Sequence, residues 1–144
     1  MTTSTATALK TLKVRVRDKH AVILSRMAYE VNQIWNAANE ETAYYAHMPV
    51  SEVGWLHIYL SAYDLAKSQA ALRKERGFLI HSQTVQEVTE AHEKARKQFK
   101  KSKLRWRISS GSKRSLGWIP LQKGCSGVEK RTSTLCRSLL QSVG

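Results

Sequence analysis

The sequence predicts an α+β fold in which a small, split antiparallel β-sheet is interrupted by an insert of three to four helices. Three observations carry this prediction: residues 9–17 alternate as a strand does, residues 104–120 have the pattern of a hairpin, and most of the chain between them has helical periodicity. With 144 residues, 42% of them hydrophobic, the chain is long enough for one domain with a modest core.

The first element is a strand with a basic outer face. Its apolar positions are Leu12, Val14 and Val16, and its basic positions are Lys13, Arg15 and Arg17. Such alternation is typical of a half-buried strand.

A long helix follows, with Asp18 as its expected N-cap and Pro49 as its downstream boundary. Its apolar positions recur at intervals of three and four: Ile23, Met27, Val31, Ile34, Trp35 and Ala38. This spacing places them on one buried face.

Three further helical segments are expected before the second strand pattern. The first is short and covers residues 52–59, and the second begins at a capping-box pair, Ser61 and Asp64, and ends near Gly77. The third begins at Ser82 as N-cap and carries the apolar stripe Val85, Val88, His92, Ala95 and Phe99. Glutamates early in this helix and lysines late in it suit the helix dipole, with Glu90/Lys94 and Glu93/Lys97 at the favourable spacing.

Residues 104–120 predict a hairpin, which consists of a strand at 104–109, a turn at 110–112 that contains Gly111, and a returning strand at 115–120. This hairpin is expected to pair with the first strand. The expected inward positions are Leu104, Trp106 and Ile108, and the expected outward positions are Arg105 and Arg107. This alternation favours core packing over base stacking for Trp106 and also for Trp118.

Positive charge is concentrated in one block of the chain. Residues 94–128 hold eleven of the 24 Lys and Arg and none of the eleven Asp and Glu. A block of one sign favours a polyanion as partner, so we expect nucleic acid, with an anionic membrane as the weaker candidate. The expected nucleic-acid-binding residues are Lys13, Arg15, Arg17, Lys97, Lys101, Arg105, Arg107, Lys113 and Arg114.

Other functions receive little support from the residues. The five histidines lack zinc-type spacing, Cys125 and Cys136 are interpreted as reduced thiols, and a helix cap explains Ser82 beside His81 without nucleophile chemistry. We therefore expect no metal, no cofactor, no small-molecule substrate and no catalytic residue. The start lacks a secretory pattern and no run is long and apolar enough to span a membrane, so a cytoplasmic location is expected.

Six ordered blocks resemble the N-terminal part of the OrfB/TnpB family of insertion-sequence proteins, long described as transposases. The blocks are LKTLKVRVRDKHA, NQIWNAANE, LSAYDL, HSQTVQEV, RKQFKKSKLRWRIS and GSKRSLGWIP. The resemblance implies RNA-guided DNA endonuclease relatives and a wedge-type β-barrel split by a helical insert, often described as a helix-turn-helix. The family's nuclease carboxylates and four-cysteine zinc element lie beyond the matched region, so no catalytic residue is carried over.

The expected organisation is a disordered start at residues 1–8, the wedge and helical region at 9–120, and a disordered tail at 121–144. The tail lacks a clean period, and we interpret it as out-of-frame sequence after a frameshift near Pro120. The predicted function is therefore the nucleic-acid-binding front of an RNA-guided nuclease, truncated before the nuclease domain. Two alternatives stay open, an autonomous helix-turn-helix DNA-binding regulator and an inert pseudogene product.

Overall fold

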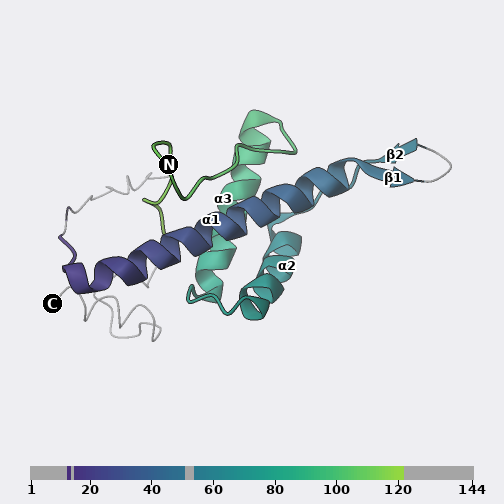
Figure 1. The fold of residues 1–144 in the computed structure, drawn as a ribbon. Coiled ribbons are helices and arrows are strands. Elements are labelled where there is room, and N and C mark those ends of the chain that lie inside the picture. Colours follow the sequence, from purple (N-terminus) through teal and green to yellow (C-terminus); the bar gives the residue numbers. More distant parts are fainter. Residues whose placement is uncertain (1–12, 14, 51–53, 122–144) are drawn as a thin grey trace, which may run out of the picture.

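The computed structural model describes residues 13, 15–50 and 54–121. Three helices, α1 (Asp18–Ala46), α2 (Ala62–Glu75) and α3 (Ser82–Phe99), form the body of this part of the chain. Strands β1 (Met48–Val50) and β2 (Gly54–Leu56) make a small antiparallel hairpin between α1 and α2. Figure 1 shows α1 running along the molecule, α3 crossing it, and the hairpin at the far end of α1.

The core forms where α1 crosses α3. Met27, Val31, Ile34 and Trp35 of α1 are buried, as the three-and-four spacing predicts. They pack against Val85 and Val88 of α3 and against Ile80 of the preceding loop. The buried carboxylate of Glu30 holds this loop by accepting hydrogen bonds from the backbone N–H groups of Leu79 and Ile80 at 2.9 and 3.1 Å.

The helix boundaries follow local capping chemistry, and the capping box predicted for α2 is confirmed. The Ser61 hydroxyl accepts from the Asp64 backbone N–H, and the Asp64 carboxylate accepts from the Ser61 backbone N–H. The other two caps lie one residue earlier than predicted. Arg17 is the N-cap of α1, without a side-chain bond, and His81 is the N-cap of α3, its Nδ1 accepting from Gln83.

The segment after α3, residues 100–121, turns back and runs along α1 (Figure 1). It is held there by a polar stripe of α1 side chains, which we call the amide ladder: Asn32, Asn36, Asn39 and Thr42. The Asn39 and Asn36 amides each pair with both the N–H and the C=O of one residue, Leu104 and Arg107 respectively, at 2.6–2.9 Å.

The ends of the ladder complete the attachment. Thr42 donates to the Ser102 carbonyl at 2.9 Å, and Asn32 donates to the Ser115 carbonyl at 2.6 Å. These side chains therefore supply hydrogen bonds that a neighbouring strand supplies in a sheet.

The predicted α+β fold with a split sheet or barrel is wrong for the described residues. Residues 13, 15–17 and 102–121 form no strand, and the rest of the expected 9–17 strand lies outside the described part. A single backbone bond, from Ser115 N–H to the Ile108 carbonyl at 2.7 Å, closes the turn at Gly111. The described fold is three-helical, because the amide ladder takes the place of a strand partner.

Two smaller expectations concern residues 52–59 and the two ends of the chain. The short helix predicted for residues 52–59 is wrong where the structure describes it, since Gly54–Leu56 is strand β2. The disorder predicted for residues 1–8 and for the tail lies outside the described residues, apart from Leu121.

Candidate nucleic-acid interface

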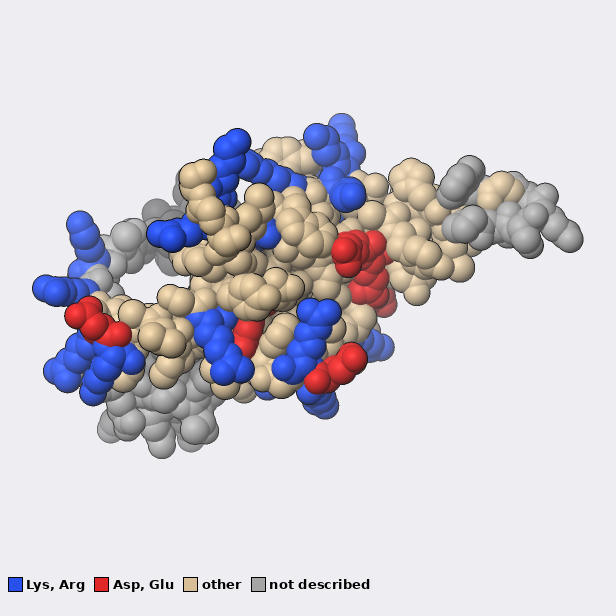
Figure 2. Space-filling model, in the orientation of Figure 1, with Lys and Arg blue, Asp and Glu red and all other residues tan. Residues whose placement is uncertain are grey.

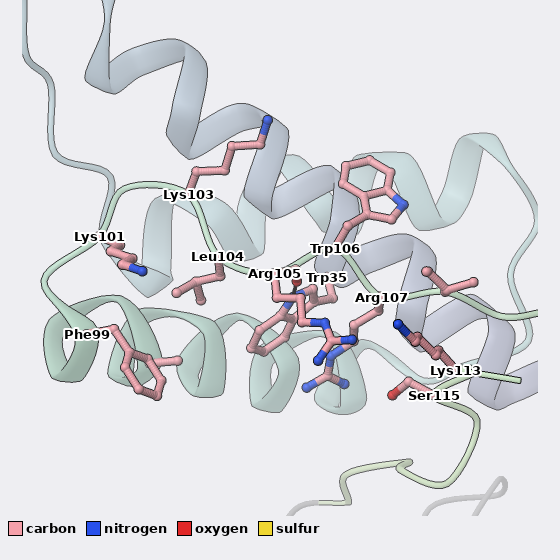
Figure 3. Close-up of a pocket in the computed structure, with 12 residues that line it drawn as sticks. Trp35, Phe99, Lys101, Lys103, Leu104, Arg105, Trp106, Arg107, Lys113 and Ser115 are labelled. Atoms are coloured by element: carbon pink, nitrogen blue, oxygen red, sulfur yellow. Dashed lines mark hydrogen bonds between the residues drawn. The ribbon is translucent and has the colours of Figure 1, made fainter.

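An open groove of about 810 Å³ lies between the 101–115 segment and the C-terminal half of α3 (Figure 3). Five cationic side chains line it: Lys101, Lys103, Arg105, Arg107 and Lys113. Its other lining residues are apolar or uncharged, and none carries a carboxylate. We call this cavity the basic groove.

Arg107 lies at the floor of the basic groove, stacked between two indole rings. Its guanidinium carbon is 3.9 Å from the centre of the Trp35 ring and 4.5 Å from that of Trp118. Burial lowers the pKa of Arg107, yet a guanidinium keeps its proton at any ordinary pH. Among the described residues, no carboxylate pairs with this half-buried cation.

This position corrects the predicted orientation of the segment. Arg107 was expected to point outward and Trp106 inward, but Arg107 is half-buried and the Trp106 side chain is 46% exposed. In Figure 3 the Trp106 ring projects away from Trp35. Cation–π stacking on two rings stabilises the buried arginine, and alternation alone does not reveal it. Trp118 does pack against the core, as expected.

The predicted binding residues fall into three groups. Lys101, Arg105, Arg107 and Lys113 line the basic groove, and Arg114 is exposed in the adjoining turn. Lys97 lies outside the groove on α3, where it pairs with Glu93 at 2.9 Å, as the spacing predicts. Glu93 also accepts from the Tyr59 hydroxyl at 2.8 Å, so it is engaged on two sides.

Lys13, Arg15 and Arg17 form the third group, at the start of α1. All three are exposed, and they are not paired with the 104–119 segment. Arg17 is 15 residues before Asn32, about 22 Å along the helix at 1.5 Å per residue. The predicted continuous basic surface is therefore wrong. Figure 2 shows separate groups of Lys and Arg, one over the segment after α3 and one at the start of α1.

The predicted site omitted several residues that line the groove, among them Lys103, Phe99 and Trp35. Lys103 belongs to the same basic run as Lys101 and Arg105, so composition alone could have included it. Phe99 was assigned to the apolar stripe of the third helix, but it is 59% exposed at the end of α3. Trp35 was expected in the core, and it both packs there and forms part of the groove floor.

His92 packs against Trp35, which lines the groove, and carries no charge at neutral pH. Its ring meets Trp35 edge-on at 4.9 Å between centres, and burial, assisted by Arg96 and Arg107, lowers its pKa from 6.5 to about 4. The buried histidine therefore supports the core rather than adding to the positive groove.

Two other site types do not occur in the part of the chain that the structure describes. No three His, Cys, Asp or Glu side chains there come together as metal ligands do. None of its helices combines the length and hydropathy required to cross a membrane.

Comparison with family models, with curated proteins and with solved structures returns no match to this chain.

Proposed function

We propose that this chain binds the sugar–phosphate backbone of nucleic acid through the basic groove. The observation that carries the proposal is the gathering of five cations in one groove that has no lining carboxylate. Uncompensated cations repel one another, and phosphate oxygens relieve that repulsion while accepting charge-assisted hydrogen bonds. A phosphodiester backbone presents such oxygens at regular intervals along its length.

We further propose that the chain acts as the non-cleaving N-terminal region of an OrfB/TnpB-type RNA-guided nuclease in the cytoplasm, with structured guide RNA or DNA backbone as partner. This assignment rests mainly on the six ordered sequence blocks. The groove supports it in one respect, because the fifth block, RKQFKKSKLRWRIS, supplies most of the groove's cations.

The helix-turn-helix regulator receives less support from the geometry. A recognition helix contacts DNA mainly with its N-terminal residues. In α3 this half carries Glu87 and exposed Glu90, whose carboxylates would face phosphates unfavourably. The basic residues follow at the end of the helix and in the segment beyond it.

The proposal is tested with the double variant Arg105→Gln/Lys113→Gln, because both side chains are exposed and removing them leaves the core intact. Arg107 is unsuitable, since its removal would leave Trp35 and Trp118 without the group between them. Binding to an RNA stem-loop is measured at several salt concentrations. We expect the slope of log K against log salt to fall by about 0.7 to 0.9 for each lost phosphate contact.

The matched control is Lys74→Gln/Arg76→Gln, which makes the same charge change at exposed positions at the end of α2. This control should retain the wild-type slope. Equal slopes and affinities for all three proteins, with circular dichroism showing each to be folded, would refute binding at the basic groove.

A further inference from the structure

Aromatic side chains stand exposed in the basic groove beside its cations. Trp106 is 46% exposed, Phe99 is 59% exposed, and Ile108 between Arg107 and the turn is 44% exposed. Single exposed apolar residues are ordinary on protein surfaces. Three of them in one groove, among five cations, form a surface with both flat apolar area and positive charge.

The Trp106 ring is held in its outward position by its neighbours in the chain. The Arg107 backbone is bonded on both sides to Asn36, and the Arg105 carbonyl accepts from Trp35 Nε1 at 3.3 Å. Trp106 therefore sits between two residues whose backbones are attached to α1. Since Arg107 already occupies the space over Trp35, the Trp106 ring has no place in the core, and a ligand meets it preorganised.

A single-stranded nucleic acid matches this combination better than a duplex does. In a strand without a partner, each unstacked base exposes a flat face next to a phosphate, and aromatic side chains stack on such faces whatever the base. In a duplex the base faces are covered by their neighbours, so only the phosphates are available. Figure 3 shows the Lys103 and Trp106 side chains on the same side of the 101–115 segment, so together they offer a cation and a stacking surface to one strand.

We propose that the basic groove binds single-stranded nucleic acid, with phosphates on its exposed cations, Lys103 among them, and one base stacked on the Trp106 ring. This inference rests on the proposed function of the groove and adds to it the strand state of the ligand and a residue that contacts the base. It also assigns Trp106 a role opposite to the core position that its sequence pattern predicts.

The test separates bases from phosphates with two oligonucleotides of equal length and charge, a twelve-nucleotide deoxythymidine strand and an abasic strand of the same phosphodiester length. The wild type should bind the thymidine strand at least about fivefold more tightly, because one stacked base contributes roughly 1–3 kcal/mol. Trp106→Ala should abolish this preference and leave abasic binding unchanged. Trp106→Phe should restore part of it.

The control is Tyr63→Ala, which removes an aromatic ring that is 69% exposed on α2 and does not line the groove. This variant should keep the wild-type preference. Wild-type protein that binds both strands equally, or that prefers an equally long duplex regardless of Trp106, would overturn the stacking proposal while leaving backbone binding intact. Wild-type protein that binds neither strand nor duplex would instead refute the proposed function itself.

Discussion

At the residue scale, the hydrogen bonds around His92 determine which form of its ring the fold accommodates. The Asn39 Nδ2 group donates to the Leu104 carbonyl, so Asn39 Oδ1 is an acceptor, and it lies 3.4 Å from His92 Nε2. His92 must therefore carry its proton on Nε2. Its Nδ1 is buried without a partner, and a second proton there would place an unsolvated charge beside Arg107.

This environment predicts that the protein loses stability in mild acid. Because the folded-state pKa of His92 is depressed from 6.5 to about 4, the unfolded chain binds the proton first as the pH falls. The free energy of unfolding should be level above pH 6.5 and decrease by roughly 3 kcal/mol as the pH approaches 4, at about 1.4 kcal/mol for each pH unit of depression. Urea unfolding at closely spaced pH values measures this decrease.

A second readout assigns the effect to His92. The NMR signal of its ring should not titrate between pH 7 and pH 5 in the folded protein. The pKa values of the Asp64 and Glu93 carboxyls are also depressed, so these two groups likewise reduce stability as the pH falls. Their effect begins only near pH 4, the ordinary range of carboxyl groups. A ring that titrates with a midpoint near 6.5 in folded protein would contradict the prediction.

At the scale of elements, the amide ladder of α1 determines where the segment after α3 lies. Asn39 is fully buried, and its side chain makes three hydrogen bonds, two to the Leu104 backbone and one to the His92 ring. Asn39→Ala leaves these groups unpaired, and each buried unsatisfied group costs about 1–3 kcal/mol. We expect a loss of about 2–4 kcal/mol in the free energy of unfolding.

The comparison for this variant is Glu40→Ala, an exposed change one residue further along α1, which should alter stability little. Hydrogen exchange of the Leu104 amide gives a local measure, and it should become much faster in Asn39→Ala. If both variants unfold alike and the Leu104 amide stays protected in each, the amide ladder does not hold the segment.

The ladder also explains which elements could be predicted from the sequence. The long helices follow from local signals, the apolar spacing of α1 and α3 and the capping pair Ser61/Asp64. The absence of a strand at residues 104–108 does not follow from local signals. These residues alternate as a strand does, but the partners of their backbone hydrogen bonds lie some 70 residues earlier in the chain. A local pattern shows that a backbone is extended and half-buried, but it does not show what satisfies that backbone.

A sequence signal for this arrangement does exist. Asn32, Asn36, Asn39 and Thr42 recur at the three-and-four spacing of a helix face, directly beside the apolar stripe. Asparagine is unfavourable within a helix, so a stripe of asparagines indicates side chains that bond to something outside it. The same reasoning applies to the candidate site. The basic run at residues 96–109 contains four of the five cations that line the groove, whereas the exchange of Trp106 and Arg107 depends on the packing of Arg107 between Trp35 and Trp118, which a local pattern does not show.

At the scale of the whole molecule, the charge is divided unequally between parts that pack together. Residues 94–128 carry a net +11 of the chain's +13, and the described portion of that block folds back onto α1. Folding brings these like charges closer together than they are in an extended chain. The native state should therefore carry an electrostatic strain that a polyanion relieves.

This charge distribution predicts opposite effects of salt on folding and on binding. Screening shortens the range of repulsion from about 30 Å at 0.01 M to about 8 Å at 0.15 M. The urea midpoint of the free protein should therefore rise with sodium chloride, because repulsion within the native state weakens, while affinity for nucleic acid falls as counterion release becomes less favourable. Arg105→Gln/Lys113→Gln should show a smaller rise, since it begins with less repulsion in the groove. A midpoint that falls with salt would mean that attractive pairs such as Glu93–Lys97 outweigh the repulsion, and the groove's cations would then lack the uncompensated charge that a phosphate backbone is proposed to neutralise.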